Sequence, residues 1–201
     1  MIDQDLINHN AETLSIALKN SCQITPQLKF IQNAFDQPLL LKLQEYFNTN
    51  YHSELWAPET TQYGVDMTNK PRYKIAWDPD SVVEEIHEVC HAMTPMLQGL
   101  NTTVPIKFDG ITLWRDHGGY DLSWHTDNPA IHLTMQIYLI GSLNNPGTEF
   151  KIDSGSIVAP FVPNTGYFID QRIIRPTHRL AHAVPANQIR YSLFALWKNV
   201  L

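Results

Sequence analysis

A histidine and an aspartate stand one residue apart at His125 and Asp127, and another histidine, His182, follows far downstream. Alternate residues of an extended strand point to the same side, so the first two side chains can bind one ion together. Two imidazoles and one carboxylate can occupy one face of an octahedral metal and leave the opposite face open, as in non-haem Fe(II) oxygen chemistry. The residue types therefore predict an iron centre, provided that the fold brings His182 to the other two.

Arg190 follows His182 closely, and Ser192 lies further along the same face of a predicted strand. A guanidinium is a permanent cation that can hold a carboxylate through two parallel hydrogen bonds. If a turn at 186–188 joins two adjacent strands, Arg190 points into the cavity that holds the metal. We predict a carboxylate-binding position there, to which Ser192 adds a hydroxyl. Taken alone, Arg190 would better suit a surface ion pair.

The first half of the chain predicts the helices that support such a site. Residues 11–20 and 37–48 are expected to be helical, with Asp36 as the N-cap of the second, and 30–35 forms a short strand between them. Residues 82–98 form the clearest helix, since apolar residues recur at helical spacing after a capping box of Ser81 and Glu84. Pro95 is expected to kink its last turn.

From residue 104 the pattern changes to short runs rich in β-branched and aromatic residues, separated by turn residues. Such runs predict strands at 104–108, 111–115, 121–125, 132–140, 148–152, 156–160, 166–170, 180–184 and 189–198. Helices followed by many short strands predict an α+β, β-dominated fold, a sandwich or barrel with the helices packed on one outer sheet. The polar segment 50–73 is either a functional lid loop or a surface excursion.

Composition limits the class of protein. The chain has 201 residues, 43% hydrophobic and 17% charged, which suits one globular domain. Its net charge of −6 makes nucleic acid a poor partner. Two cysteines, Cys22 and Cys90, suit a reducing compartment. The acidic N-terminus is unlike a signal peptide, and no apolar run reaches the ~20 residues that cross a bilayer. We expect a soluble, cytoplasmic protein whose oligomeric state is open.

The run from Gly119 to Pro129, which contains both His125 and Asp127, resembles the first metal motif of the 2-oxoglutarate/Fe(II)-dependent dioxygenases of the prolyl-4-hydroxylase type. Residues 133–139 and 147–150 are similar to the strands that follow it in that family. The segment 182–193 resembles the family's closing block. Together these matches cover roughly residues 105–198, with a looser match for the N-terminal helices.

The resemblance implies a double-stranded β-helix, or jelly roll, over 104–201, supported by helices and a lid loop within 1–103. It implies that the three predicted ligands bind Fe(II). It also implies that Arg190 holds the distal carboxylate of 2-oxoglutarate, helped by Ser192 and the Tyr138 hydroxyl. The implied activity is O2-dependent hydroxylation of a C–H bond in an amino-acid, peptidyl or small-metabolite substrate, with release of succinate and CO2.

The chain departs from the family pattern in two places. The interval between His182 and Arg190 is slightly short, and His178 offers a competing distal ligand. We prefer His182, because its His-x-Val-Pro context fits the family and the context of His178 does not. Glu149 stands where a small or apolar residue is more usual.

Polar and aromatic residues around the predicted metal strand are candidates for contact with the substrate. They are Trp114, Tyr120, Asn128 and Arg172. Asn128 follows a predicted ligand, and Arg172 forms a group of three cations with Arg175 and Arg179 that could meet an anionic substrate. The alternative interpretation is core packing for the aromatic residues and an ordinary polar turn for Arg172.

Two other functions compete with the oxygenase. His87, Glu88 and His91 match the zinc-peptidase motif H-E-x-x-H, in which one helix supplies two ligands and a general base. No third ligand follows at an obvious spacing, and Ile86, Val89 and Met93 already give that helix a core face. A jelly roll could also bind a small carboxylate through Arg190 without redox chemistry.

Overall fold

The computed structural model describes residues 3–200 except 60, 63–64, 67–70 and 101–103. The described helices are α1 (Gln4–Lys19), α2 (Gln37–Thr49), α3 (Val82–Ala92) and α4 (Thr94–Gly99). The described strands are β1 (Cys22–Thr25), β2 (Leu28–Gln32), β3 (Ala57–Pro58), β4 (Thr61–Gln62), β5 (Val65–Asp66), β6 (Arg72–Ile75), β7 (Ile106–His117), β8 (Leu133–Gly141), β9 (Thr148–Ile152), β10 (Gly155–Ala159), β11 (Thr165–Asp170), β12 (His178–Leu180) and β13 (Ile189–Asn199).

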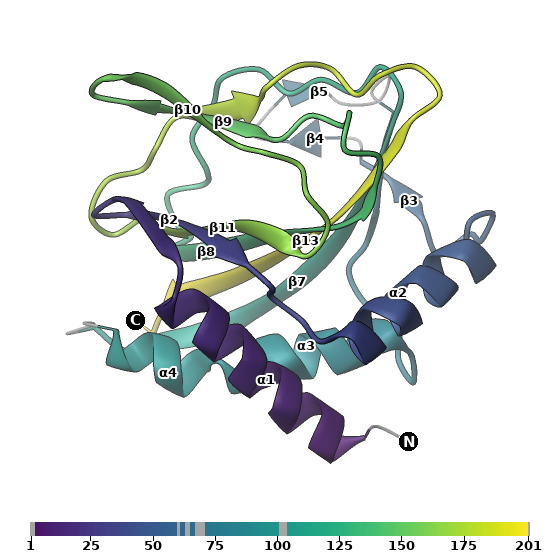
Figure 1. The fold of residues 1–201 in the computed structure, drawn as a ribbon, viewed down its shortest axis with the longest axis horizontal. Coiled ribbons are helices and arrows are strands. Elements are labelled where there is room, and N and C mark those ends of the chain that lie inside the picture. The colour runs from purple at the N-terminus through teal and green to yellow at the C-terminus, as the bar shows by residue number, and fades with distance from the viewer. Residues whose placement is uncertain (1–2, 60, 63–64, 67–70, 101–103, 201) are drawn as a thin grey trace.

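Two antiparallel sheets face each other, and the helices cover the outer face of the larger one (Figure 1). The larger sheet has the order β1-β2-β11-β8-β13-β7-β6-β3, and the smaller has the order β10-β9-β12. His125 extends the smaller sheet by one position, because it forms an isolated antiparallel bridge with His178 of β12. The predicted α+β, β-dominated fold with helices on one outer sheet is confirmed.

The central strand β8 shows how the sequence separates the core from the site. Alternate residues of a strand point to opposite faces. Met135, Ile137 and Leu139 belong to the apolar core shared with the helices. Gln136 and Tyr138 face the other sheet, and both are buried. A buried polar face needs hydrogen-bond partners or a ligand, so the space between the two sheets is the natural place for chemistry.

The helices begin where the sequence predicts. The Asp36 carboxylate accepts a hydrogen bond from the Leu39 amide at the start of α2, and the Ser81 hydroxyl caps α3. Glu84 accepts from the Asp80 amide, so the predicted capping box is not formed in its usual pairing. The predicted helix over 82–98 is two helices, α3 and α4, with the junction at Met93 ahead of Pro95.

Several strand predictions differ from the structure. Residues 104–108 and 111–115 are one strand, β7, which passes through Gly110 at a φ of 137°. Residues 121–125 and 180–184 are not strands, apart from the bridge at His125 and the first residue of the second range. Single backbone hydrogen bonds join the two segments instead: the Leu180 amide donates to the Leu122 carbonyl, and the Val184 amide donates to the carbonyl of Tyr120, just before the first range.

The N-terminal half also differs in detail. Helix α1 is longer than the predicted 11–20, and the strand predicted at 30–35 is β2. Strand β1 was not predicted, because it is short and none of its residues is buried. The segment 50–73 contains β3, β4, β5 and the start of β6, and part of it lies outside the described residues, so its role as a lid stays a prediction. No helix in the described ranges has the length and apolar character that a membrane crossing needs.

Candidate metal centre

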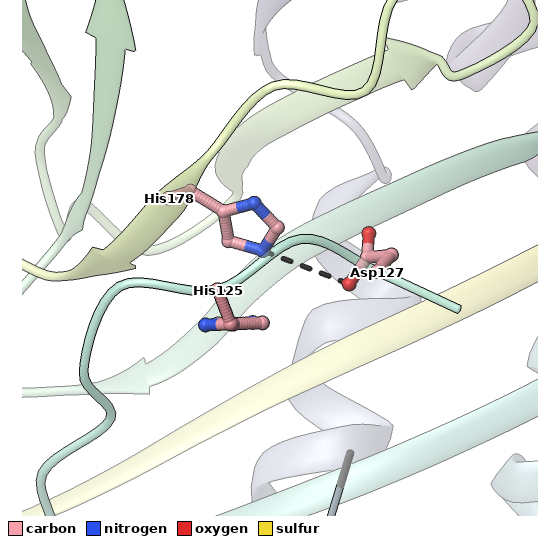
Figure 2. Close-up of side chains that lie close together, drawn as sticks. All are labelled: His125, Asp127 and His178. Carbon is pink, nitrogen blue, oxygen red and sulfur yellow. Dashed lines mark ion pairs between the residues drawn. The ribbon is translucent and has the colours of Figure 1, made fainter. Parts of the chain in front are cut away.

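His125, Asp127 and His178 converge between the two sheets (Figure 2). One possible ligand atom from each lies within 4.8 Å of the others. His178 Nε2 lies 3.6 Å from the Asp127 carboxylate, and the two imidazole centroids are 4.3 Å apart. Asp127 and His178 are buried, whereas His125 is partly exposed. Within the described part of the chain, this is the one group of three such side chains close enough to share a metal ion.

The outer nitrogen of each imidazole is held by a backbone carbonyl. His125 Nδ1 lies 2.9 Å from the Ser123 carbonyl oxygen, and His178 Nδ1 lies 3.1 Å from that of Pro176. A carbonyl only accepts, so the neutral imidazole must carry its proton on Nδ1. The lone pair is then on Nε2 of each ring, which is the arrangement that a histidine needs to ligate a metal.

The environment also favours the neutral form of His125. Burial lowers its pKa to about 4, and the neighbouring His178 imidazole acts in the same direction. A metal ion therefore meets little proton competition at this nitrogen near neutral pH. The third donor is oriented as well, because Gln171 donates from Nε2 to the Asp127 Oδ2 at 2.7 Å.

The prediction that His182 completes the ligand set is wrong. His182 is exposed, lies in a bend after β12, and is not part of the group around Asp127. Strand β12 begins at His178, whose backbone pairs with His125, so His178 is the histidine brought to the other ligands. The His-x-Val-Pro sequence around His182 resembles the family motif. However, the strand that places a histidine beside Asp127 is β12, which begins earlier, at His178.

A cavity opens from this group into the space between the sheets, with about 440 Å³ of empty volume including its mouth. Arg190 lines it and is 2% exposed, as predicted for a cation that points inward. Arg190 faces Asp116 on the adjacent strand β7, and Asp116 faces Arg72 on the next strand, β6. The shared carboxylate lies 3.0 Å from Arg190 Nε and 2.8 Å from Arg72 Nε. Two buried guanidinium groups thus flank one buried carboxylate at the cavity wall.

Solved structures with this architecture are numerous, although the sequences differ. A prolyl hydroxylase from Trichoplax adhaerens, in complex with a hypoxia inducible factor peptide, matches at 13% identity with a TM-score of 0.72, over 98% of this chain and 94% of that one. A Pseudomonas putida prolyl-4-hydroxylase matches at 12% identity and a TM-score of 0.65, over 94% and 98% of the two chains. A 2OG-Fe(II) oxygenase family oxidoreductase from Burkholderia pseudomallei matches at 13% and 0.62, over 98% and 92%.

The chain has the prolyl-4-hydroxylase fold. The predicted double-stranded β-helix is therefore confirmed. No family model matches the sequence, and no curated protein matches it either. The likeness to these solved structures is therefore one of fold, at low sequence identity.

Ser192 and Tyr138 are paired on adjacent strands and lie on the face of the larger sheet that is turned toward the smaller one, but neither lines the cavity. The Ser192 hydroxyl accepts a hydrogen bond from Gln136 Nε2 at 3.0 Å, and the Tyr138 hydroxyl donates to Thr148 Oγ1 at 2.9 Å. Gln136 and Thr148 themselves line the cavity. The predicted contact of Ser192 and Tyr138 with a carboxylate stays a prediction.

The four predicted substrate residues have different surroundings. Trp114 lines the cavity, where Arg72 stacks 4.0 Å from its ring. Tyr120 is fully buried, and its hydroxyl accepts a hydrogen bond from Arg72, so it is a packing residue. The Asn128 side chain accepts from the Ala130 amide in a turn. Arg172 pairs with its neighbour Asp170 and lies outside the cavity.

Glu149 has a clear role that the sequence could not assign. It accepts hydrogen bonds from the Arg179 guanidinium at 2.7 Å and from the Ser156 hydroxyl. Both hydrogen bonds lower the pKa of the Glu149 carboxyl, and the bond from Ser156 has the larger effect. The same guanidinium lies 4.6 Å from the centroid of Trp124, which precedes His125. Arg179 follows His178 directly, so this contact ties together the two segments that carry the ligand histidines.

Among the described residues, the H-E-x-x-H motif is not part of a group that could hold a metal ion. Glu88 contacts both histidines, at 3.0 Å from His87 Nδ1 and 3.8 Å from His91 Nδ1, and both rings pack on Phe108. No third side chain of the ligating kind joins them in the ranges that the structure describes. The motif belongs to the surface and edge of α3, as the core pattern of that helix suggested.

Sequence reasoning missed several residues that line or support the site. They are Arg72, Gln136, Thr148, Tyr167 and Gln171. Alternation along β8 was a usable signal for Gln136, because it faces the same side as Tyr138. Arg72 and Gln171 carry no local signal, since their positions depend on pairing with distant segments.

Proposed function

We propose that this protein is an Fe(II)- and 2-oxoglutarate-dependent dioxygenase that hydroxylates a C–H bond of an amino-acid, peptidyl or small-metabolite substrate, with release of succinate and CO2. One observation carries the proposal: the His125, Asp127 and His178 donors converge at a cavity that also contains Arg190. Two imidazoles and one carboxylate with open positions are the ligand set of non-haem Fe(II) oxygenases. The fold of the similar oxygenases agrees with this assignment.

The residues present fit the metal. Each histidine offers Nε2, because a backbone carbonyl holds the proton on Nδ1. Gln171 holds one oxygen of Asp127, while the other faces His178. When bound, iron would activate O2 with the electrons of 2-oxoglutarate, whose oxidation gives succinate and CO2.

The remaining residues position the co-substrate and exclude water. Arg190 is a buried permanent cation on the cavity wall, suited to the distal carboxylate of 2-oxoglutarate. Asp116 fixes its orientation through Nε, and the Pro146 carbonyl accepts from Nη1. Such a fixed guanidinium loses little side-chain entropy on binding a carboxylate. Leu180, Phe194 and Trp114 line the same cavity and keep it apolar elsewhere.

The direct test is succinate formation from 2-oxoglutarate in the presence of Fe(II), O2 and a reductant. Asp127→Ala should abolish it and should also abolish Mn(II) binding measured by equilibrium dialysis. Asp153→Ala removes an exposed carboxylate outside the cavity and should retain both.

A non-enzymatic carboxylate-binding protein is the second candidate, because Arg190 alone could hold a small dicarboxylate. Binding of 2-oxoglutarate without Mn(II) or Fe(II) binding, and without succinate formation, would establish that function and refute the oxygenase.

A further inference from the structure

Arg72 lines the metal cavity together with Arg190, and the proposed function gives it no task. It is the first residue of β6 and belongs to the segment 50–73, for which the sequence predicted either a lid or a surface excursion. Strand β6 pairs with β7, so that Arg72 lies opposite Asp116, and β7 pairs with β13, so that Asp116 lies opposite Arg190. The three charged side chains therefore form a row across three adjacent strands of the larger sheet.

All three side chains of this row are removed from water. Their exposed fractions are 4% for Arg72, 0% for Asp116 and 2% for Arg190. A buried charge is costly unless an opposite charge compensates it. Two guanidinium groups share one carboxylate here, so the row has one net positive charge. Glu59 does not cancel this charge, because it is paired with Lys74 at 2.8 Å. One further carboxylate would bring the row to neutrality.

The two contacts of Asp116 differ in kind. Arg190 Nε donates a hydrogen bond to Oδ2 at 3.0 Å. Arg72 Nε lies 2.8 Å from Oδ1, but its N–H is not aligned with that oxygen, so the contact is an ion pair without a hydrogen bond. Arg72 thus acts on Asp116 through its charge. Without that charge, Asp116 would be the full countercharge of Arg190 and would compete with an incoming carboxylate.

Two aromatic residues hold the Arg72 guanidinium in place. Its carbon Cζ lies 4.0 Å from the ring centroid of Trp114 and 4.6 Å from that of Tyr120. The Tyr120 hydroxyl also accepts a hydrogen bond from Nη1. An aromatic face attracts a cation, and the attraction is stronger where water is excluded. These contacts fix the positive charge of Arg72 beside Asp116.

We propose that Arg72 is a positioning residue for the co-substrate and acts on Arg190 through Asp116. By sharing the Asp116 carboxylate, Arg72 keeps the charge of Arg190 available for the distal carboxylate of 2-oxoglutarate. Nε and Nη1 of Arg190 already donate to Asp116 and to the Pro146 carbonyl. Its Nη2 makes no hydrogen bond to the described residues and can donate to the ligand. The inference rests on the proposed oxygenase function, and it gives β6 a part in co-substrate binding.

The test measures ligand binding by isothermal titration calorimetry on protein loaded with Mn(II), so that no turnover occurs. The two probes are 2-oxoglutarate and oxalate, which chelates a metal but has no distal carboxylate for Arg190. Arg72→Gln removes one charge and leaves Asp116 paired with Arg190. It should weaken 2-oxoglutarate binding by about tenfold or more, because a close charge contact is lost. Oxalate binding should stay within about twofold, since oxalate does not contact the row.

Arg72→Lys is the conservative variant. It keeps the positive charge but loses the planar guanidinium that contacts Tyr120 and Asp116 together. It should weaken 2-oxoglutarate binding by about two- to fivefold, which is less than in Arg72→Gln, and should leave oxalate binding unchanged. A residue that only supported the fold would show no such rescue and no such difference between the ligands. If Arg72→Gln does not fold, this selective loss in Arg72→Lys decides the matter, and equal losses for both ligands would overturn the proposal.

The matched control is Lys74→Gln, which removes a cation from the same strand and changes the net charge by the same amount. Lys74 pairs with Glu59 and does not line the cavity. The control should bind both ligands within about twofold of the unmodified protein. Three results would refute the role of Arg72. They are unchanged 2-oxoglutarate binding in Arg72→Gln, equal weakening of both ligands in that variant, and equal weakening of 2-oxoglutarate binding in Arg72→Gln and Lys74→Gln.

Failure of the proposed function gives a different result. An unmodified protein that binds neither Mn(II) nor oxalate refutes the oxygenase itself. If the unmodified protein binds Mn(II), oxalate and 2-oxoglutarate, while Arg72→Gln retains full affinity for all three, only the role of Arg72 is refuted. An unchanged circular dichroism spectrum shows that each variant is folded.

Discussion

His125 and His178 exchange two backbone hydrogen bonds, each 2.9 Å long, in which the amide of either residue donates to the carbonyl of the other. Directly opposed residues in such a pair have side chains on the same face of the sheet. The bridge therefore fixes both imidazoles beside each other, with centroids 4.3 Å apart, before any metal is considered. One backbone pairing thus determines which histidine of the 178–182 region meets Asp127.

Replacement of the two competing histidines should have opposite results. His178→Ala should lower Mn(II) affinity by more than roughly 100-fold, because loss of a ligand costs more than loss of its hydrogen-bonding support. His182→Ala should leave Mn(II) affinity and succinate formation nearly unchanged, since His182 is exposed and outside the group. Equilibrium dialysis measures both. A weakened metal site in His182→Ala with an intact one in His178→Ala would reverse the assignment.

Gln171 should contribute to metal affinity without touching the metal. Its amide holds one oxygen of Asp127 at 2.7 Å, and both residues are buried. Residues that orient a ligand in this way typically change metal affinity by about 10–100-fold, so Gln171→Ala should lower Mn(II) affinity by at least about tenfold. Gln32→Ala, at an exposed position of β2, is the control and should have no effect. Unchanged affinity in both variants would show that Asp127 needs no such support.

Asp116 should matter more to stability than any other carboxylate near the cavity. It is fully buried between Arg72 and Arg190 on adjacent strands. Asp116→Asn leaves two buried guanidinium groups without their shared countercharge, which should reduce the free energy of unfolding by about 3–5 kcal/mol. Urea unfolding followed by circular dichroism measures this loss, and Asp153→Asn serves as the exposed control.

The same variant distinguishes a structural role from a role in co-substrate binding. If Arg190 binds 2-oxoglutarate, Asp116→Asn should raise the KM for 2-oxoglutarate more than it changes kcat, because the guanidinium loses its fixed orientation. A fall in kcat with no change in the KM for 2-oxoglutarate would argue against that role for Arg190.

The sequence predicted most of the core strands because their signals are local. The runs at 148–152 and 166–170 match β9 and β11 closely, since β-branched and aromatic residues there are bounded by turn residues. The pair His125 and Asp127 was predicted for the same reason, because one spacing placed both side chains on one side. Arg190 was also found to line the cavity as expected.

The sequence failed where position depends on distant pairing. His178 becomes a ligand through its bridge to His125, and Arg72 enters the cavity because β6 pairs with β7 opposite Asp116. Neither pairing leaves a trace in the residues nearby. The short strand β12 and the irregular segment before His125 also lack the alternation that identifies a strand. Register between remote segments is set by the whole hydrophobic pattern and not by local sequence.

The metal-free protein should lose stability as the pH falls, and His125 should cause part of the loss. Its pKa is lowered to about 4 in the folded state, chiefly by burial, against about 6.5 in the unfolded chain. Between these values the unfolded chain binds a proton that the folded chain does not, so the free energy of unfolding decreases as the pH falls from 6.5 to 4. The full contribution is at most about 3 kcal/mol. Urea unfolding in the presence of a chelator, at several pH values, measures it. His125→Asn cannot titrate, so its stability should fall less steeply over this interval; parallel curves for the two proteins would show that His125 is not buried as a neutral imidazole.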